Sequence, residues 1–278
     1  MIYLALQPMD TIMKVLDQPY TLSQKQIEFY QENKYIKLKD VFDAETLAHF
    51  KEVIERKVSD LSTQSLPMEE RDTYSKAFLQ IMNLWRESEE VKQFVFGKRL
   101  AGIATQLMQT TGARLYHDQA LFKEPGGGFT PWHADQYYWP LASDHTVTAW
   151  VPLQAVPIEM GPLEFSAKSH LLQDGRNLKI SDDSEQIIAK KLRLGDFDKV
   201  VEPFELGEVS FHSGWIFHRA GANTTNQMRS VMTIIYMDKD MKLKQPENEN
   251  QQLDWDTWCP GAKVGQLIDS PLNPVLFE

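Results

Sequence analysis

The sequence predicts an α+β fold in which helices come first and a β-sandwich or β-barrel follows. Helical spacing of apolar residues dominates about 20–110, whereas from about Ala113 short strand-like runs separated by glycine and proline replace it. Helices followed by many strands are typical of α+β proteins. The sequence contains no strand that is followed by a glycine-rich turn and a helix, so we do not expect a dinucleotide-binding fold. We expect one domain over 1–278, with its β core at about 113–240 and a tail at about 241–278.

Composition excludes several classes of function. The chain of 278 residues is 42% hydrophobic and 24% charged, as globular proteins are. Its formal net charge is −10 and it contains no block of Lys or Arg, so we do not expect a nucleic-acid partner. No segment approaches the roughly 18 consecutive apolar residues of a membrane helix. Cys259 is the only cysteine and the N-terminus resembles no signal peptide, so we expect a cytoplasmic protein. The oligomeric state is unknown.

The first elements are predicted from capping residues. Ser23, followed by Gln26, forms a capping box that opens a helix ending near Asn33. Residues 35–38 then alternate as a half-buried strand does. Asp43 is placed to cap a second helix, because apolar residues repeat at helical spacing after it.

Two further helices are expected before the β region. Apolar residues between Phe78 and Trp85 recur at helical spacing, and so do those at 91–108, where Gly97 and Gly102 indicate interruptions. Residues 1–20 show no clear pattern.

The β region contains strand-like segments bounded by turn residues. They are residues 115–122, 146–153, 161–165, 207–212 with a continuation at 215–218, and 229–237. Turns are expected at 126–128 and 221–226. The polar segment 172–200 is predicted to form an excursion from the sheet, and a lid is one candidate role for it. The tail, including Trp255 and Trp258, is predicted to pack irregularly against the domain.

The most informative stretch is Thr130–Trp139, which contains His133-Ala134-Asp135. In an extended strand, side chains at i and i+2 leave the same face, so His133 and Asp135 should point at one place. One more histidine would complete the two-histidine, one-carboxylate set that holds non-haem Fe(II).

His212 and His218 are the candidates for that third ligand. If 221–226 is a hairpin turn centred after Asn223, His218 lies directly opposite Arg229, and opposed side chains share a face. This register would place a guanidinium, suited to binding a carboxylate, beside the metal. The alternatives are a hydrogen-bonded core histidine for His218 and a surface ion pair for Arg229. His212 is expected to support the site or pack in the core, and His117 to face the same cavity as Gln119.

These residues resemble the signature of the phytanoyl-CoA dioxygenase family, whose members are Fe(II)- and 2-oxoglutarate-dependent oxygenases. The resemblance extends over most of 20–278 and is least typical at 172–200. Besides the five residues His133-Ala134-Asp135, His218 and Arg229, it includes Tyr116–Gln119, Trp132–Trp139, Trp150–Leu153, Gly161–Phe165, Phe211–Trp215 and Ser270–Pro274. It implies a double-stranded β-helix, a cupin-like jelly roll with N-terminal helices packed on it.

The resemblance also implies roles for individual residues. His133, Asp135 and His218 match the iron ligands, and Arg229 matches the arginine that binds the distal carboxylate of 2-oxoglutarate. Trp150 and Gln119 match positions that contact this cosubstrate. One departure is Ala220, which stands where family members can carry a small hydroxyl residue two positions after the distal histidine.

The resemblance therefore implies a dioxygenase that uses Fe(II), 2-oxoglutarate and O2, and that hydroxylates a small organic molecule with release of succinate and CO2. The alternative is a jelly roll that binds a metal or small ligand without catalysis. A hydrolytic Zn²⁺ site would leave Arg229 without a purpose. Tyr137, Tyr138 and Trp139 either line the substrate side or pack in the sheet. No basic cluster suited to the phosphates of coenzyme A is present, and the substrate cannot be read from the sequence.

Overall fold

The computed structural model of the protein describes residues 8–278. Two antiparallel sheets form its centre, one of seven strands and one of four. The strands are β1 (Tyr35–Leu38), β2 (Leu79–Met82), β3 (Ala113–Phe122), β4 (Thr130–His133), β5 (Thr146–Pro152), β6 (Leu163–Ser166), β7 (Lys199–Val201), β8 (Val209–Ser213), β9 (His218–Ala220), β10 (Val231–Asp238) and β11 (Val275–Phe277). The larger sheet has the order β1-β8-β5-β10-β3-β11, with β2 also paired to β3, and the smaller has the order β4-β9-β6-β7. The predicted α+β fold with a jelly-roll core is confirmed.

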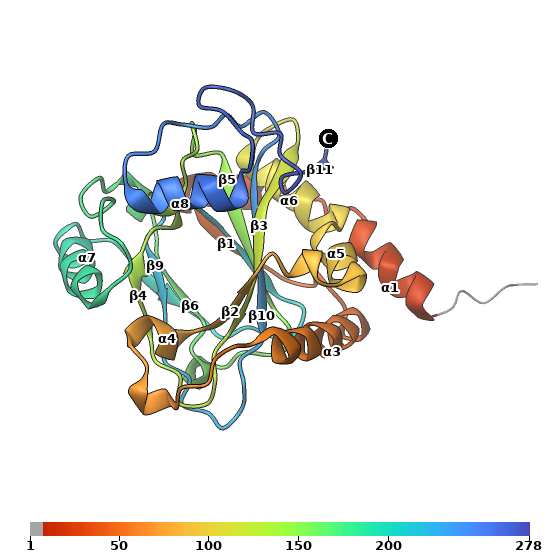
Figure 1. Cartoon of the computed structure of the whole chain (residues 1–278), viewed down its shortest axis with the longest axis horizontal. Helices are drawn as coiled ribbons and strands as arrows, with labels where there is room; N and C mark the ends of the chain where they lie inside the picture. Colours follow the sequence, from red (N-terminus) through yellow and green to blue (C-terminus); the bar gives the residue numbers. More distant parts are fainter. Residues whose placement is uncertain (1–7) are drawn as a thin grey trace, which may run out of the picture.

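Helices cover the outer face of the larger sheet. In Figure 1, α1, α3, α5 and α6 lie on one side of this sheet, and the smaller sheet with α7 lies on the other. The helices are α1 (Pro8–Asp17), α2 (Gln24–Asn33), α3 (Ala44–Leu61), α4 (Thr73–Ala77), α5 (Glu89–Val95), α6 (Lys98–Met108), α7 (Asp182–Leu194) and α8 (Glu249–Trp258). None of the helices in residues 8–278 is both long enough and apolar enough to span a bilayer.

The two faces of β10 pack against different parts of the molecule. Ile234 and Tyr236 belong to the large apolar cluster between the sheet and the N-terminal helices. Ile235, which points the other way because side chains alternate along a strand, lines a cavity between the two sheets. One face of the larger sheet therefore supports the fold, and the other is available for a site.

The predictions that rest on capping residues are confirmed. The side chain of Ser23 accepts a hydrogen bond from the Gln26 amide, and the Gln26 side chain accepts one from the Ser23 amide, so the capping box opens α2. Asp43 Oδ1 accepts a hydrogen bond of 2.7 Å from Thr46 N at the start of α3. The strand predicted at 35–38 is β1.

Several other predictions are wrong. The segment from Phe78 to Trp85 is not a helix, because Leu79–Met82 pairs with β3 as an edge strand, and a left-handed residue, Asn83, ends it. Gly97 does separate two helices, but Gly102 interrupts nothing. It lies inside α6, where the ring of Phe277 packs against it, 3.0 Å from where a Cβ would stand.

Three further differences concern the N-terminus, the segment after β8 and the tail. Residues 8–17 form α1, although the sequence of 1–20 showed no pattern that predicted it; residues 1–7 lie outside the described residues. Residues 215–217 turn rather than continue β8, since Ile216 N donates to Ser213 O, and β9 begins only at His218. Part of the tail is helical, because Glu249–Trp258 is α8.

Candidate metal centre

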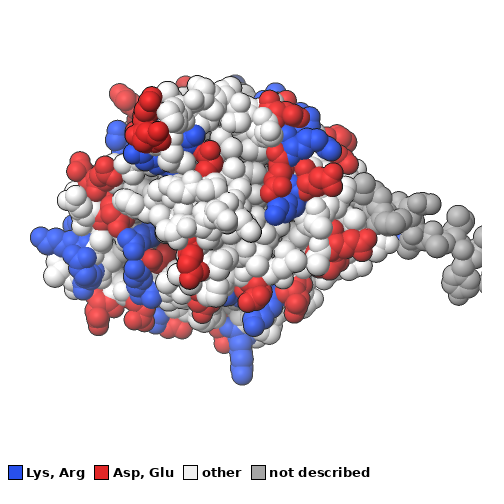
Figure 2. Space-filling model, turned by 90° about the horizontal axis from the view of Figure 1, so that it is seen from below, with Lys and Arg blue, Asp and Glu red and all other residues white. Residues whose placement is uncertain are grey.

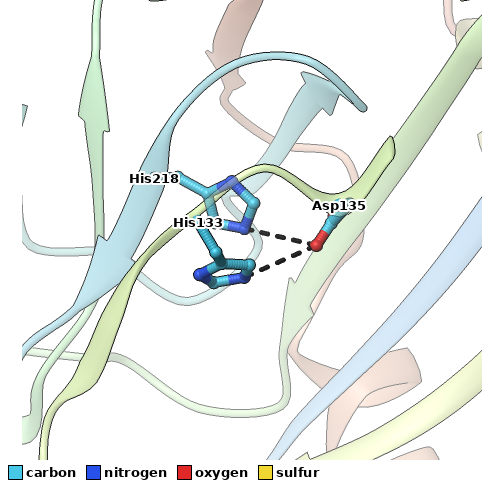
Figure 3. Close-up of side chains that lie close together, drawn as sticks. All are labelled: His133, Asp135 and His218. Atoms are coloured by element: carbon cyan, nitrogen blue, oxygen red, sulfur yellow. Dashed lines mark ion pairs between the residues drawn. The ribbon is translucent and has the colours of Figure 1, made fainter. Parts of the chain in front are cut away.

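Two short segments bring His133, Asp135 and His218 together. His133 ends β4 and Asp135 begins a 3₁₀ turn (η3, Asp135–Tyr138), with Ala134 extended between them at φ −123° and ψ 128°. Their side chains therefore leave the chain on one side, as the i, i+2 spacing predicts. His218 begins β9 and is the register partner of His133. Figure 3 shows the three side chains converging on one point.

The donor atoms have the spacing of a single ion site. Nε2 of His133 is 3.5 Å from Asp135 Oδ1, and Nε2 of His218 is 3.7 Å from the same oxygen. One ligand atom from each of the three residues lies within 4.8 Å of the others. Two imidazoles and one carboxylate on one side of an ion leave positions open on the other side, which is the geometry of non-haem Fe(II) sites.

Backbone carbonyls orient both imidazoles. His133 Nδ1 lies 2.7 Å from Pro131 O, and His218 Nδ1 lies 3.2 Å from Ile216 O. Because a carbonyl can only accept, each Nδ1 carries the proton and each Nε2 presents its lone pair to the site. Burial, with His133 close by, keeps the pKa of His218 well below its usual value, so this ring is neutral and able to bind a metal.

Asp135 has supporting partners on its second oxygen. Thr148 Oγ1 donates to Oδ2 at 3.4 Å, and His212 Nε2 lies 3.4 Å from the same atom. Burial alone would raise the pKa of Asp135, but the surrounding imidazoles of His218, His133 and His212 hold it well below the usual range. The carboxylate is therefore ionised, as a metal ligand must be.

The hairpin argument for Arg229 is wrong, although the residue lies at the site. β9 belongs to the four-stranded sheet and β10 to the seven-stranded sheet, so the two strands are not paired. Arg229 precedes β10 and faces Lys123 across an isolated bridge. It meets His218 because both line the cavity between the sheets. The chain crosses from one sheet to the other at 221–226 instead of turning back on itself.

That cavity has a volume of about 630 Å³, within the usual range for small-molecule sites. Every residue predicted to bind a metal or cosubstrate lines it: His133, Asp135, His218, Arg229, Trp150 and Gln119. Tyr138 and Trp139 line it too, whereas the hydroxyl of Tyr137 accepts a hydrogen bond from Asn250 of α8. Ala220 also lines the cavity and brings no hydroxyl.

Arg229 is a buried cation without an acidic partner. The side chain is fully buried, and no ion pair to it is found within residues 8–278. Its Nη1 donates to Gly161 O, its Nε has no partner in the described part of the chain, and its guanidinium lies 5.5 Å from the centre of the Trp150 ring. Burial lowers its pKa to about 9, so it remains charged at neutral pH. The buried Nε1 of Trp150 has no partner either.

These unpaired donors fit a carboxylate. A buried cation is costly unless an anion pairs with it, and a planar guanidinium pairs well with a carboxylate. Arg229 and Trp150 both line the cavity that holds the histidine and aspartate cluster, and each has one buried N–H group without a partner among residues 8–278. A dicarboxylic cosubstrate such as 2-oxoglutarate would satisfy them.

The structure also shows what His212 and His117 contact. His212 supports Asp135, as described above. His117 lines the cavity beside Gln119, with its Nδ1 unpartnered, and burial lowers its pKa to about 3. Gln119 Oε1 accepts a hydrogen bond of 2.8 Å from Gln80 Nε2.

The polar excursion at 172–200 packs mainly outside the cavity. Glu185 of α7 accepts a hydrogen bond of 2.8 Å from Trp132 N, and Ile188 packs with Trp132 and Phe217. Within the excursion, Lys179 and Ile180 line the cavity. Sequence reasoning missed these two residues, as well as the cavity-lining residues of α8.

Comparison with known proteins places this site in context. A family model described as phytanoyl-CoA dioxygenase matches residues 30–231. The chain is 21% identical over 227 residues to a probable alpha-ketoglutarate-dependent hypophosphite dioxygenase of Stutzerimonas stutzeri, an alignment that covers 76% of this chain and 77% of that protein.

Solved structures share the fold. The alpha-ketoglutarate-dependent carbocyclase SnoK is 24% identical, with a TM-score of 0.75, over 93% of this chain and 99% of its own. The epimerase SnoN, solved with Fe3+, alpha ketoglutarate and nogalamycin RO, is 23% identical, with a TM-score of 0.76, over 91% and 98% of the two chains. EctD from S. alaskensis, solved with 2-oxoglutarate and 5-hydroxyectoine, is 18% identical, with a TM-score of 0.69, over 96% and 91%.

Proposed function

The chain belongs to the phytanoyl-CoA dioxygenase family, and on that premise we propose that it hydroxylates a small organic molecule with release of succinate and CO2. It is an Fe(II)- and 2-oxoglutarate-dependent dioxygenase, as the resemblance predicted. The observation that supports the proposal most is the convergence of His133, Asp135 and His218 in a cavity that is also lined by Arg229, a buried arginine with no acidic partner among residues 8–278.

We assign the residues as follows. His133 and His218 would bind iron through Nε2, and Asp135 through its carboxylate. Arg229 would pair with the distal carboxylate of 2-oxoglutarate, and Trp150 would form the wall beside it. Gln119 lines the same cavity and is assigned to the cosubstrate side.

Iron and 2-oxoglutarate, when bound, supply the oxidation, in which O2 is consumed, 2-oxoglutarate is split into succinate and CO2, and one oxygen atom reaches the substrate. The protein orients these partners. Pro131 O and Ile216 O fix the two imidazoles, while Thr148 and His212 hold the aspartate. The buried cation selects a dicarboxylic acid over an uncharged keto compound.

A small substrate fits the charges around the cavity. Of the described residues that line it, only Arg229 and Lys179 carry a positive charge, and Arg229 is assigned to the cosubstrate. On the face of the molecule in Figure 2, basic and acidic side chains are interspersed without a continuous basic patch. These observations do not favour a coenzyme A ester, whose phosphates need several cations. The proposal of a cytoplasmic location rests on the single cysteine, Cys259, which is buried.

The direct test uses His133→Ala and Asp135→Ala. Both variants should lose oxygen-dependent succinate formation while keeping the circular dichroism of the wild type, because the side chains lie at a cavity and not in an apolar cluster. His145→Ala is the matched control, since 56% of that side chain is exposed and it lies outside the cavity lining. Full turnover of 2-oxoglutarate in either ligand variant would overturn the assignment.

A further inference from the structure

Helix α8 presents one complete face to the cavity. Its cavity-lining residues are Asn250, Leu253, Asp254, Thr257 and Trp258. Their spacing of i, i+3, i+4, i+7 and i+8 defines a single stripe along a helix. On an ordinary surface helix this stripe is apolar and packs on the core, whereas here it contains an amide, a hydroxyl and a carboxyl group. Leu253, although apolar, is 64% exposed. The stripe therefore faces a space that the protein itself does not fill.

Other contacts hold α8 in place next to the metal centre. Gln251 Nε2 donates to Tyr137 O at 3.1 Å, and Asn250 Nδ2 donates to the Tyr137 hydroxyl at 3.1 Å. Tyr137 belongs to the short 3₁₀ turn that begins with Asp135. Trp255 packs against an apolar cluster of the tail and the larger sheet. Figure 1 shows α8 crossing between the β9 side and the β3 side of the molecule. A helix anchored in this way is a fixed wall of the cavity.

Asp254 is the acidic group of the stripe, and burial raises the pKa of its carboxyl to about 7, so it is ionised above that pH. Its Oδ2 accepts a hydrogen bond of 2.9 Å from the Tyr116 hydroxyl. Within residues 8–278, Oδ1 accepts no hydrogen bond and no Lys or Arg pairs with the carboxyl group. The apolar part of the wall beside it is aromatic, since Tyr138, Trp139 and Trp258 line the same cavity. The Trp258 ring lies 5.4 Å from that of His117, which also lines the cavity.

We propose that the α8 stripe recognises the primary substrate, and that Asp254 selects a ring-bearing molecule whose end is a hydrogen-bond donor, namely a hydroxyl or a protonated amine. The inference rests on the proposed function, because it requires that the cavity hold a substrate beside the cosubstrate. A partly buried carboxylate with one free oxygen binds donors strongly and repels carboxylates and phosphates. The aromatic side chains bind the apolar body of the molecule.

Three probes with the same ring and different ends test this selectivity: 2-phenylethylamine, 2-phenylethanol and 3-phenylpropanoate. Each is titrated into the protein with Fe(II) and 2-oxoglutarate under anaerobic conditions at about pH 8.5, where Asp254, with a pKa of about 7, is ionised. Binding is followed by tryptophan fluorescence, since Trp139 and Trp258 line the cavity. The amine and the alcohol should bind wild type about tenfold or more tightly than the acid, the range of a hydrogen bond to a charged group.

Asp254→Asn should reduce the preference for the amine over the acid by about tenfold, because it keeps the shape and removes the charge. Asp256→Asn is the matched control. Asp256 lies on the same helix, is exposed and is absent from the cavity lining, and among residues 8–278 its side chain accepts a hydrogen bond from Gln252 alone. It should leave all three affinities within about twofold of wild type.

Two results would overturn the inference. The first is equal or tighter binding of the acid by wild type, which would indicate that Lys179 governs the selectivity. The second is a preference for the amine over the acid in Asp254→Asn that is as large as in wild type. Slow succinate formation without substrate, measured on wild type and Asp256→Asn, tests the proposed function separately. If both lack it while the probes are still discriminated, the proposed function fails and the recognition by α8 stands.

Discussion

Replacing Arg229 should separate cosubstrate binding from stability. This side chain is fully buried, keeps its charge, and has no acidic partner within residues 8–278. In Arg229→Gln the carboxylate of 2-oxoglutarate would meet an amide instead of a guanidinium. Removing one member of a buried charge pair costs about 2 to 5 kcal/mol. The dissociation constant for 2-oxoglutarate should therefore rise by about 30-fold to 5,000-fold, at about 1.36 kcal/mol per tenfold.

The same substitution should not weaken the ligand-free protein. Burial of an unpaired cation is unfavourable, and a neutral side chain of similar polarity can still donate to Gly161 O, so the free energy of unfolding should stay the same or rise. Isothermal titration with 2-oxoglutarate and chemical denaturation without it measure the two quantities. A binding constant within threefold of wild type, or a large loss of stability, would refute the role given to Arg229.

Arg219→Gln is the matched control for this experiment. Arg219 lies next to His218 in sequence, but its side chain pairs with Glu164 and Glu185 and is absent from the cavity lining. Its replacement should lower the free energy of unfolding by about 1 to 3 kcal/mol, because the buried Glu164 loses one of its two cationic partners. The affinity for 2-oxoglutarate should remain that of the wild type.

Three further predictions concern the scaffold. Burial raises the pKa of Asp118 to about 7, so its contribution to stability is full below about pH 4 and is lost as the pH rises toward 7. In urea unfolding, the wild type should therefore lose stability relative to Asp118→Asn between about pH 5 and pH 8. A difference in unfolding free energy between the two proteins that does not change with pH would contradict this. Gly161→Ala should lower the melting temperature by the equivalent of at least about 1 to 3 kcal/mol, because Gly161 has φ +72° and a Cβ would stand 2.2 Å from Gly221 O; an unchanged melting temperature would be incompatible with this backbone. Asp43→Ala removes the N-cap of α3 and should lower the free energy of unfolding, measured by chemical denaturation, by about 1 kcal/mol. An unchanged free energy of unfolding would show that the cap does not stabilise the helix.

The features that could be predicted from sequence are those decided by neighbouring residues. The capping box at Ser23 and the cap at Asp43 act within one turn, so both helices start where expected. The same locality applies to His133 and Asp135, whose common direction depends only on the extended residue between them. The roles of His218 and Arg229 are supported only by the family resemblance, because the hairpin that was expected to place them opposite each other does not form.

The features that were missed depend on distant partners. Leu79–Met82 becomes a strand because β3 offers an edge, which nothing within the segment reveals. The pairing of His133 with His218 joins positions far apart in the chain, and only the arrangement of two sheets decides it. Helix α8 escaped detection because the stripe of a helix that faces a cavity need not be apolar, so the usual periodicity is absent. The substrate wall is consequently the least predictable part of the site.

The central claim is that His133, Asp135 and His218 hold one iron ion. Anomalous diffraction at the iron edge, from crystals soaked anaerobically with Fe(II), tests it most directly. We predict a single strong peak within bonding distance of both Nε2 atoms and the Asp135 carboxylate, which is lost in Asp135→Ala. A peak elsewhere, or none between these three side chains in the wild type, would contradict the account.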